Sequence, residues 1–120
     1  MAEKRLLVVD DRPELGEVVR RAAVGIGYEV QVTVHAKEFM RVFEKFDPTV
    51  VVLDIVMPDI DGIELVKWLY ERGTDAKIFV TTAFNPHYAQ MAEALGEAKG
   101  LDISLIKKPF RVAELRDALR

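Results

Sequence analysis

Val50-Val51-Val52-Leu53-Asp54 is the stretch of sequence that decides the fold. Four consecutive apolar, mostly β-branched residues are typical of a strand that is buried on both faces of a parallel sheet. A second run of this kind, residues 6–9, ends in the acidic pair Asp10-Asp11. Carboxylates at the ends of parallel strands gather at one edge of the sheet, where open α/β folds bind their ligands. We therefore expect the three aspartates to form one acidic cluster.

Apolar runs alternate with longer amphipathic segments along the whole chain. The pattern predicts strands over 5–9, 28–34, 50–53, 77–81 and 103–106. Helices are expected from Pro13 to the Gly25-Ile26-Gly27 stretch, over 36–46, over 62–72, from Asn85-Pro86 and from Arg111. The first helix should bury Leu15, Val18, Val19, Ala22 and Ile26. Strands that alternate with crossover helices predict an α/β fold, with a parallel sheet covered by helices on both faces.

Composition excludes several classes of function. The chain has 120 residues and a net charge of −3, which suits one domain and gives no electrostatic case for binding nucleic acid. Because it has no cysteine, disulfides, thiolate catalysis and zinc–sulfur sites are excluded. No signal-peptide core and no apolar run of the ~20 residues that span a membrane is visible. We expect one domain over residues 1–120, free-standing or cut from a longer protein, in the cytoplasm.

Each aspartate also has a purely structural interpretation. Asp10 or Asp11 could cap the helix that begins at Pro13, but one acidic residue would suffice for that role, so the pair favours a metal site. Asp54 could merely cap a turn, whereas its position after a buried strand favours a metal ligand or a nucleophile. Magnesium suits this cluster because it binds one or two protein carboxylates and takes its other ligands from water and phosphate oxygens.

Two further strand ends carry groups that suit a phosphate ligand. Thr82 follows the predicted strand 77–81, where it could be an ordinary β-forming residue or could donate its hydroxyl to a phosphoryl oxygen. Lys108 lies just beyond the predicted strand 103–106. A lysine in such a place is more often solvated, but an ammonium group near three carboxylates is a natural counter-ion and phosphate ligand.

These residues resemble the receiver domain of bacterial two-component response regulators, a family that includes the single-domain chemotaxis regulator. The resemblance covers essentially the whole chain, and the matching residues agree in order and approximate spacing. They are Val8-Val9-Asp10-Asp11, Asp54 with Met57-Pro58 and Asp61-Gly62, Thr82-Ala83, and Lys108-Pro109-Phe110. The resemblance implies a flavodoxin-like, three-layer α/β/α sandwich with five parallel strands in the order 2-1-3-4-5 and five helices.

The resemblance also implies a function, that of a phosphoryl-accepting signalling switch in a His-to-Asp phosphorelay. It would be no enzyme beyond catalysing its own phosphorylation and slow dephosphorylation. Asp54 would be the phosphoacceptor, and Thr82, Ala83 and Lys108 would bind the phosphoryl group. The metal would be Mg²⁺, with Mn²⁺ as a substitute. Its ligands would be Asp10, Asp11, Asp54 and the backbone carbonyl of Val56.

The partners implied are those of a phosphorelay. A sensor histidine kinase or a histidine phosphotransfer protein would donate the phosphoryl group. Phosphorylation would change the surface of the fourth helix, the fifth strand and the fifth helix, which an output domain or a target protein would recognise. A homodimer through this surface is a family-level possibility, whereas nucleic acid and membrane are not expected as partners of this domain.

Three features depart from the family pattern. Leu105 stands where an aromatic residue is usual, so the output is expected to be transmitted differently. The segment from Thr82 to Lys108 is several residues longer than usual, which should enlarge the fourth helix or the loop after it. Val56 and Phe84 stand where polar groups are common. We expect these two to hinder an attacking water and to give a long-lived phosphoryl group, while the small Ala83 still admits the donor.

Other classes of function fit the residues less well. A haloacid-dehalogenase-like phosphatase carries a second acidic residue two positions after its nucleophile. In this chain the residue two positions after Asp54 is Val56, and the one two positions after Asp10 is Arg12, so neither aspartate fits that pattern. A flavodoxin needs a phosphate loop rich in hydroxyls and glycine after its first strand, where the acidic pair would repel phosphate. A receiver-like interaction module that no longer accepts phosphate is the remaining alternative.

Overall fold

The computed structural model describes residues 3–57, 62–82 and 86–120, and in this part of the chain strands and helices alternate. The strands are β1 (Arg5–Val9), β2 (Glu29–Thr33), β3 (Val50–Asp54), β4 (Lys77–Thr82) and β5 (Ile103–Lys107). The helices are α1 (Pro13–Val24), α2 (Ala36–Phe46), α3 (Gly62–Glu71), α4 (Pro86–Lys99) and α5 (Val112–Leu119). The strands form one parallel sheet in the order β2-β1-β3-β4-β5, which confirms the predicted fold and strand order.

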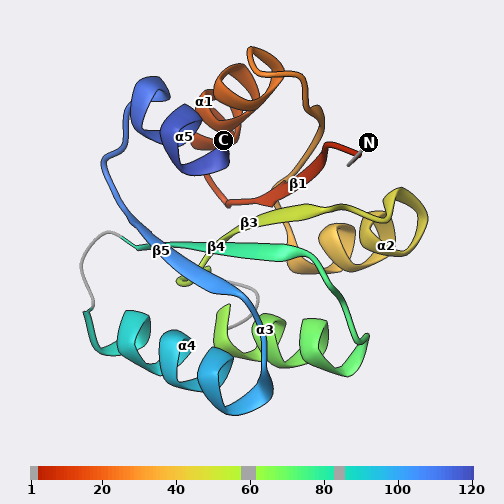
Figure 1. The fold of residues 1–120 in the computed structure, drawn as a ribbon, viewed down its shortest axis with the longest axis vertical. Helices are drawn as coiled ribbons and strands as arrows, with labels where there is room; N and C mark the ends of the chain where they lie inside the picture. The colour runs from red at the N-terminus through yellow and green to blue at the C-terminus, as the bar shows by residue number, and fades with distance from the viewer. Residues whose placement is uncertain (1–2, 58–61, 83–85) are drawn as a thin grey trace.

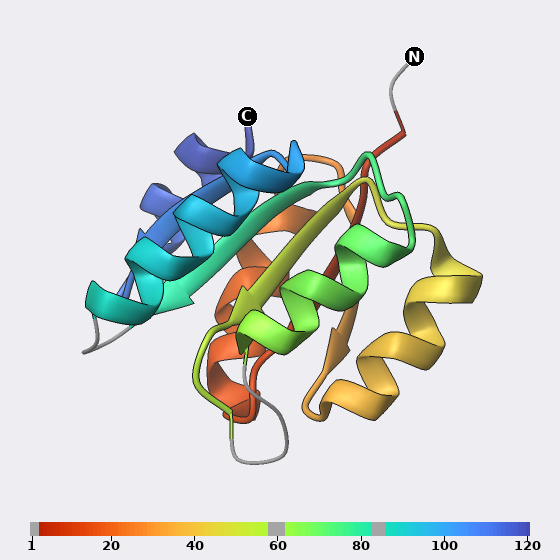
Figure 2. The ribbon, with the colours of Figure 1, turned by 90° about the horizontal axis from the view of Figure 1, so that it is seen from below.

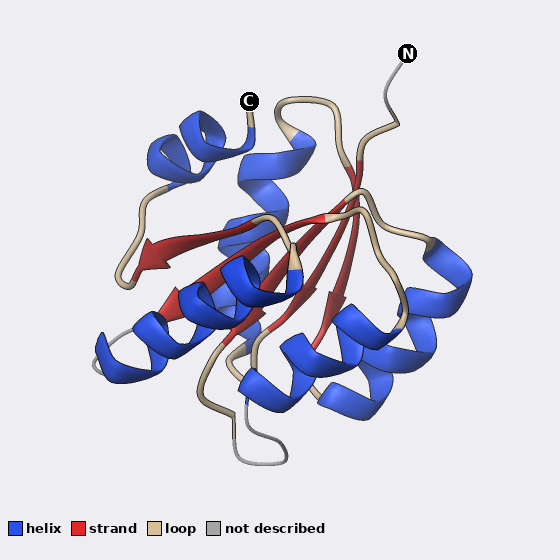
Figure 3. Ribbon diagram, turned by 60° about the horizontal axis from the view of Figure 1, so that its bottom comes forward, coloured by secondary structure: helices blue, strands red, loops and turns tan. Residues whose placement is uncertain are grey.

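Helices cover both faces of the sheet. Helices α1 and α5 lie together on one face, and α2, α3 and α4 lie on the other (Figure 1). The same three layers are visible from below in Figure 2. All strand arrows end along one edge of the sheet, as Figure 3 shows. That edge is where the sequence places the aspartates, the threonine and the lysine.

The central strands are buried on both faces, as their unbroken apolar sequences predict. Successive side chains of a strand point to opposite faces. Leu6 and Val8 accordingly pack with α1 and α5, whereas Leu7 and Val9 pack in the core under α2, α3 and α4. The four side chains are at most 1% exposed. Burial of this kind holds the strand ends, and therefore the acidic residues that follow, on a rigid frame.

The predicted boundaries differ from the observed ones by one residue at half of the strand ends. Strands β3, β4 and β5 each run one residue further than predicted, so Asp54 and Thr82 are the last residues of their strands. Helix α1 ends at Val24, and Ile26 lies beyond it, although its side chain still packs on the predicted face. Asn85, the expected start of the fourth helix, lies outside the described residues. In the described part of the chain, none of the helices has the length and apolar character that crossing a membrane requires.

Candidate functional site

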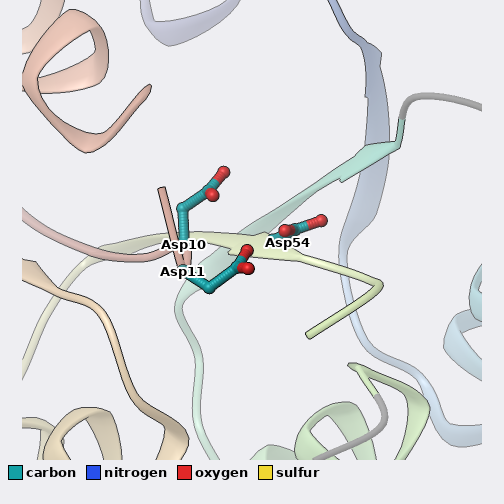
Figure 4. A group of neighbouring side chains, drawn as sticks. All are labelled: Asp10, Asp11 and Asp54. Carbon is teal, nitrogen blue, oxygen red and sulfur yellow. The ribbon is translucent and has the colours of Figure 1, made fainter. Parts of the chain in front are cut away.

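The acidic cluster forms where β1 and β3 end side by side. Val9 pairs with Leu53 in the register of the two strands, so Asp10 and Asp54 emerge next to each other. One carboxylate oxygen from each of Asp10, Asp11 and Asp54 can be chosen so that all lie within 4.8 Å of one another. Figure 4 shows the three side chains lying next to one another. Asp10 is 4% and Asp54 5% exposed, whereas Asp11 is open to solvent.

Lys108 supplies the positive charge of the cluster. Its Nζ lies 2.9 Å from Oδ2 of Asp10 and 3.3 Å from Oδ2 of Asp54, and its side chain is only 11% exposed. The backbone N–H of Lys108 donates to the carbonyl of Thr82 at 2.8 Å, which ties the start of the β5–α5 connection to the end of β4. The ammonium group of Lys108 therefore lies beside the carboxylates of Asp10 and Asp54, as expected.

Backbone N–H groups hold the second oxygen of each buried carboxylate. The N–H of Arg12 donates to Oδ1 of Asp10 at 3.0 Å, and the N–H of Val56 donates to Oδ1 of Asp54 at 3.3 Å. Both contacts join an aspartate to the residue two positions later, a common turn made by this side chain. These donors could not be singled out in the sequence, because every residue type except proline carries an N–H. The local pattern of an aspartate at a strand end followed by a turn was the available signal.

Burial dominates the electrostatics of Asp54. Burial raises the pKa of its carboxyl from 3.8 to about 6; the charge of Lys108 lowers the pKa, that of Asp10 raises it, and the N–H of Val56 lowers it. One ammonium group faces two buried carboxylates, so the cluster carries more negative than positive charge when both carboxylates are ionised. A bound divalent cation would supply the missing charge.

The donor set suits magnesium on chemical grounds. Three carboxylates offer hard oxygen ligands, and no nitrogen or sulfur ligand belongs to the cluster that the described residues form. Magnesium is held in proteins by one or two such carboxylates together with water and phosphate oxygens. The exposed position of Asp11 leaves one side of the cluster open to such further ligands.

Three other predicted site residues lie in the described part of the chain. Thr82 is 9% exposed at the end of β4, and Val56, just past Asp54, is 57% exposed. Leu105 is half-buried in β5 and packs against the core under α2, α3 and α4. The predicted site residues Ala83 and Phe84 lie outside the described part of the chain, as do Pro58 and Asp61 of the family pattern.

Comparisons with known proteins agree with this geometry. The family model of the response regulator receiver domain matches residues 6–120. The transcriptional regulatory protein TrcR of Mycobacterium tuberculosis is 34% identical over 117 residues, which cover 97% of this chain and 44% of the relative. The response regulator MprA of Mycolicibacterium vanbaalenii is 34% identical over 116 residues, covering 97% of this chain and 48% of the relative.

A solved structure matches the fold over almost the whole chain. The chemotaxis protein CheY4 of Vibrio cholerae is 25% identical and superimposes with a TM-score of 0.84, covering 98% of this chain and 97% of that one. The chain spans about half the length of the curated relatives that it matches. From its sequence and its fold alike, the chain belongs to the response regulator receiver domain family.

Proposed function

We propose that this chain is the phosphoryl-accepting switch of a two-component phosphorelay and that Asp54 is its phosphoacceptor. The observation that carries the proposal is the burial of Asp54 beside Lys108 and Asp10 at the ligand-binding edge of the sheet. Membership of the receiver family supports it, because response regulators receive their phosphoryl group from histidine kinases. Residues 1–120 would form one receiver domain.

The proposed reaction is a direct transfer to the carboxylate of Asp54. An oxygen of Asp54 forms a bond to phosphorus while the bond between phosphorus and the donor's imidazole nitrogen breaks. The imidazole, which carries a proton on its other ring nitrogen, keeps the electron pair of the broken bond and leaves as a neutral ring. Since the pKa of Asp54 is about 6, its carboxyl is mainly ionised at neutral pH and can act as the nucleophile.

Magnesium fits the cluster, and its proposed ligands are Asp10, Asp11, Asp54 and the backbone carbonyl of Val56. When bound, the ion would offset the charge of the carboxylates and of the transferring phosphoryl group. Mn²⁺ would serve in its place. The backbone N–H groups of Arg12 and Val56 each bond one oxygen of Asp10 and Asp54, which would fix how these carboxylates face the ion.

Lys108 and Thr82 would bind the oxygens of the added phosphoryl group. Lys108 already lies 3.3 Å from Asp54, so the added oxygens would compete for its ammonium group. Thr82 would donate its hydroxyl to a phosphoryl oxygen. Because the carbonyl of Thr82 accepts the N–H of Lys108, a shift of one residue is transmitted to the backbone of the other. Coupling between such a site and its output surface is typically about 1–3 kcal/mol.

The output surface is proposed to comprise α4, β5 and α5. An output domain or a target protein would bind there, and Leu105 takes the place of the usual aromatic residue in β5. The donor would be a sensor histidine kinase or a histidine phosphotransfer protein. A cytoplasmic location suits such partners and stays a prediction.

Incubation with acetyl phosphate and Mg²⁺, followed by intact mass measurement, tests the proposal. We expect one phosphoryl adduct on the parent, none on Asp54→Ala and none in the presence of EDTA. Asp75→Ala is the matched control, because Asp75 is an exposed aspartate just before β4, at the opposite edge of the sheet. No adduct on the parent would favour an inert interaction module, and an adduct on Asp54→Ala would move the acceptor elsewhere.

A further inference from the structure

A buried threonine on β4 holds the backbone on both sides of Asp54. Thr81 is 1% exposed and pairs with Asp54 in the sheet register. Its hydroxyl donates to the carbonyl of Leu53 at 3.4 Å, and its own carbonyl accepts the N–H of Ile55 at 3.2 Å. These two partners belong to the peptide groups immediately before and after Asp54. The proposed nucleophile therefore extends from a backbone that one residue fixes at both ends.

The same arrangement occurs at the end of β1. Thr33, on β2, is 2% exposed and pairs with Val9 in the sheet register. Its hydroxyl donates to the carbonyl of Val8 at 2.7 Å, and its carbonyl accepts the N–H of Asp10 at 3.2 Å. Here the fixed backbone leads directly into Asp10, the other buried carboxylate of the cluster.

The two hydroxyls add something that the sheet itself does not require. The backbone carbonyls of Thr33 and Thr81 would make their ladder bonds with any side chain at these positions. Valine would also fill nearly the same volume as threonine. Burying a hydroxyl is unfavourable unless it is hydrogen-bonded. Both hydroxyls are nevertheless buried, and both bond the backbone within two residues of a carboxylate. They come from β2 and β4, the outer neighbours of the two acid-bearing strands.

We propose that Thr81 and Thr33 are positioning residues of the phosphorylation site, which hold the backbone from which Asp54 and Asp10 reach the metal and the phosphoryl group. The inference rests on the proposed function and names residues that act through others. Groups behind the ligands of a metal set their orientation, and a site loosened by even ~0.5 Å loses activity. Thr81 directly precedes Thr82 at the end of β4. The carbonyl of Thr81 accepts the N–H of Ile55, next to the acceptor, and the carbonyl of Thr82 accepts the N–H of Lys108.

The test compares hydroxyl removal with hydroxyl retention. Thr81→Val and Thr33→Val remove the hydroxyls with little change in volume, whereas Thr81→Ser and Thr33→Ser retain them. Thr49→Val is the matched control, because the Thr49 hydroxyl exchanges two hydrogen bonds with the backbone of Arg5 at the other end of β1. Three quantities are measured for each variant: the phosphorylation rate with acetyl phosphate at saturating Mg²⁺, the Mg²⁺ concentration at half-saturation by calorimetry, and stability in urea.

We expect each valine variant to be phosphorylated about three- to tenfold more slowly, or to need about that much more Mg²⁺, the range to which one modest hydrogen bond corresponds. The serine variants should recover the parent values, and Thr49→Val should change stability alone. Parent values of both rate and Mg²⁺ half-saturation in both valine variants would overturn the inference while the proposed function stands.

Two further outcomes keep the two proposals separate. If the parent takes up no phosphoryl group, the proposed function fails, and the Mg²⁺ titrations alone then decide whether the threonines position the carboxylates. Should a valine variant fail to fold, the hydroxyl protons of Thr33 and Thr81 are followed by NMR in the parent. Slow exchange with water supports the hydrogen bonds, and fast exchange of both protons overturns the inference.

Discussion

Replacing Asp54 by Asn should stabilise the protein at neutral pH in the absence of metal. The pKa of Asp54 is raised from 3.8 to about 6, chiefly by burial. Between these values the folded protein keeps a proton that the unfolded chain has released, so the free energy of unfolding falls as the pH rises from about 4 to about 6. Asn cannot ionise and avoids this loss. The ammonium group of Lys108 keeps its partner Asp10 at 2.9 Å in the variant.

The size of the effect follows from the same pKa. A rise from 3.8 to about 6 corresponds to about 3 kcal/mol, which is the upper limit of the gain at pH 7. At pH 4 the carboxyl of Asp54 is protonated in the folded parent, and the gain should nearly vanish. The expected difference is therefore about 1–3 kcal/mol at pH 7 and close to zero at pH 4.

Urea unfolding in EDTA at the two pH values measures this difference. Trp68 is the single tryptophan of the chain and packs edge-on against the ring of Phe43, so its fluorescence should report unfolding. Asp75→Asn is the control, since this exposed aspartate lies far from the cluster. Adding Mg²⁺ should stabilise the parent by about 2.7 kcal/mol at 100 times its dissociation constant and the variant by less. Equal or lower stability of Asp54→Asn at pH 7 in EDTA would refute the reasoning.

Three other variants probe the same site and its frame. Lys108→Met should lower the metal-free stability by about 3 kcal/mol at pH 8, because it leaves buried carboxylates unpaired, and by less at pH 5, where Asp54 is mainly protonated; urea titrations at the two pH values measure both. Gly62→Ala should cost about 3 kcal/mol, since a methyl group there would lie 2.5 Å from backbone atoms of Ile55; a parent-like urea midpoint would contradict it. The double variant Val56→Asn, Phe84→Glu should lose its phosphoryl group faster than the parent, because polar groups can orient a water molecule. Intact mass measurement follows this loss over time. Equal or faster loss from the parent would show that apolar shielding does not set the lifetime of the phosphoryl group.

The gathering of the acidic residues could be predicted from the sequence, because buried strands and the shared edge of a parallel sheet both place them together. The apolar runs before Asp10 and Asp54 locate buried parallel strands, and parallel strands end at a common edge. The observed contacts of Lys108 with both aspartates follow from that topology. Strand order, by contrast, came from the family resemblance, because apolar runs alone do not say which strands pair. Ile26 shows the limit of periodicity: it continues the helical pattern, but the chain has already left the helix at Gly25.

The threonines that hold the strand ends could not be found in the sequence. Thr33 and Thr81 look like ordinary β-forming residues, and a threonine that bonds a neighbouring strand has the same local pattern as one that does not. Only the register places Thr81 opposite Asp54 and Thr33 opposite Val9. The raised pKa of Asp54 could not be predicted from the sequence either, since it depends on how deeply the carboxyl is buried and on its distance from Lys108.

The most direct test of Asp54 as the acceptor is to trap the phosphorylated protein chemically. Borohydride reduces an acyl phosphate to an alcohol, so peptide mapping after treatment with acetyl phosphate, Mg²⁺ and borohydride identifies the modified residue. Reduction at Asp54 alone, abolished by EDTA, is the predicted result. Reduction at Asp10, Asp11 or another carboxyl, or at none, would contradict the assignment of the cluster as a phosphoryl-accepting site centred on Asp54.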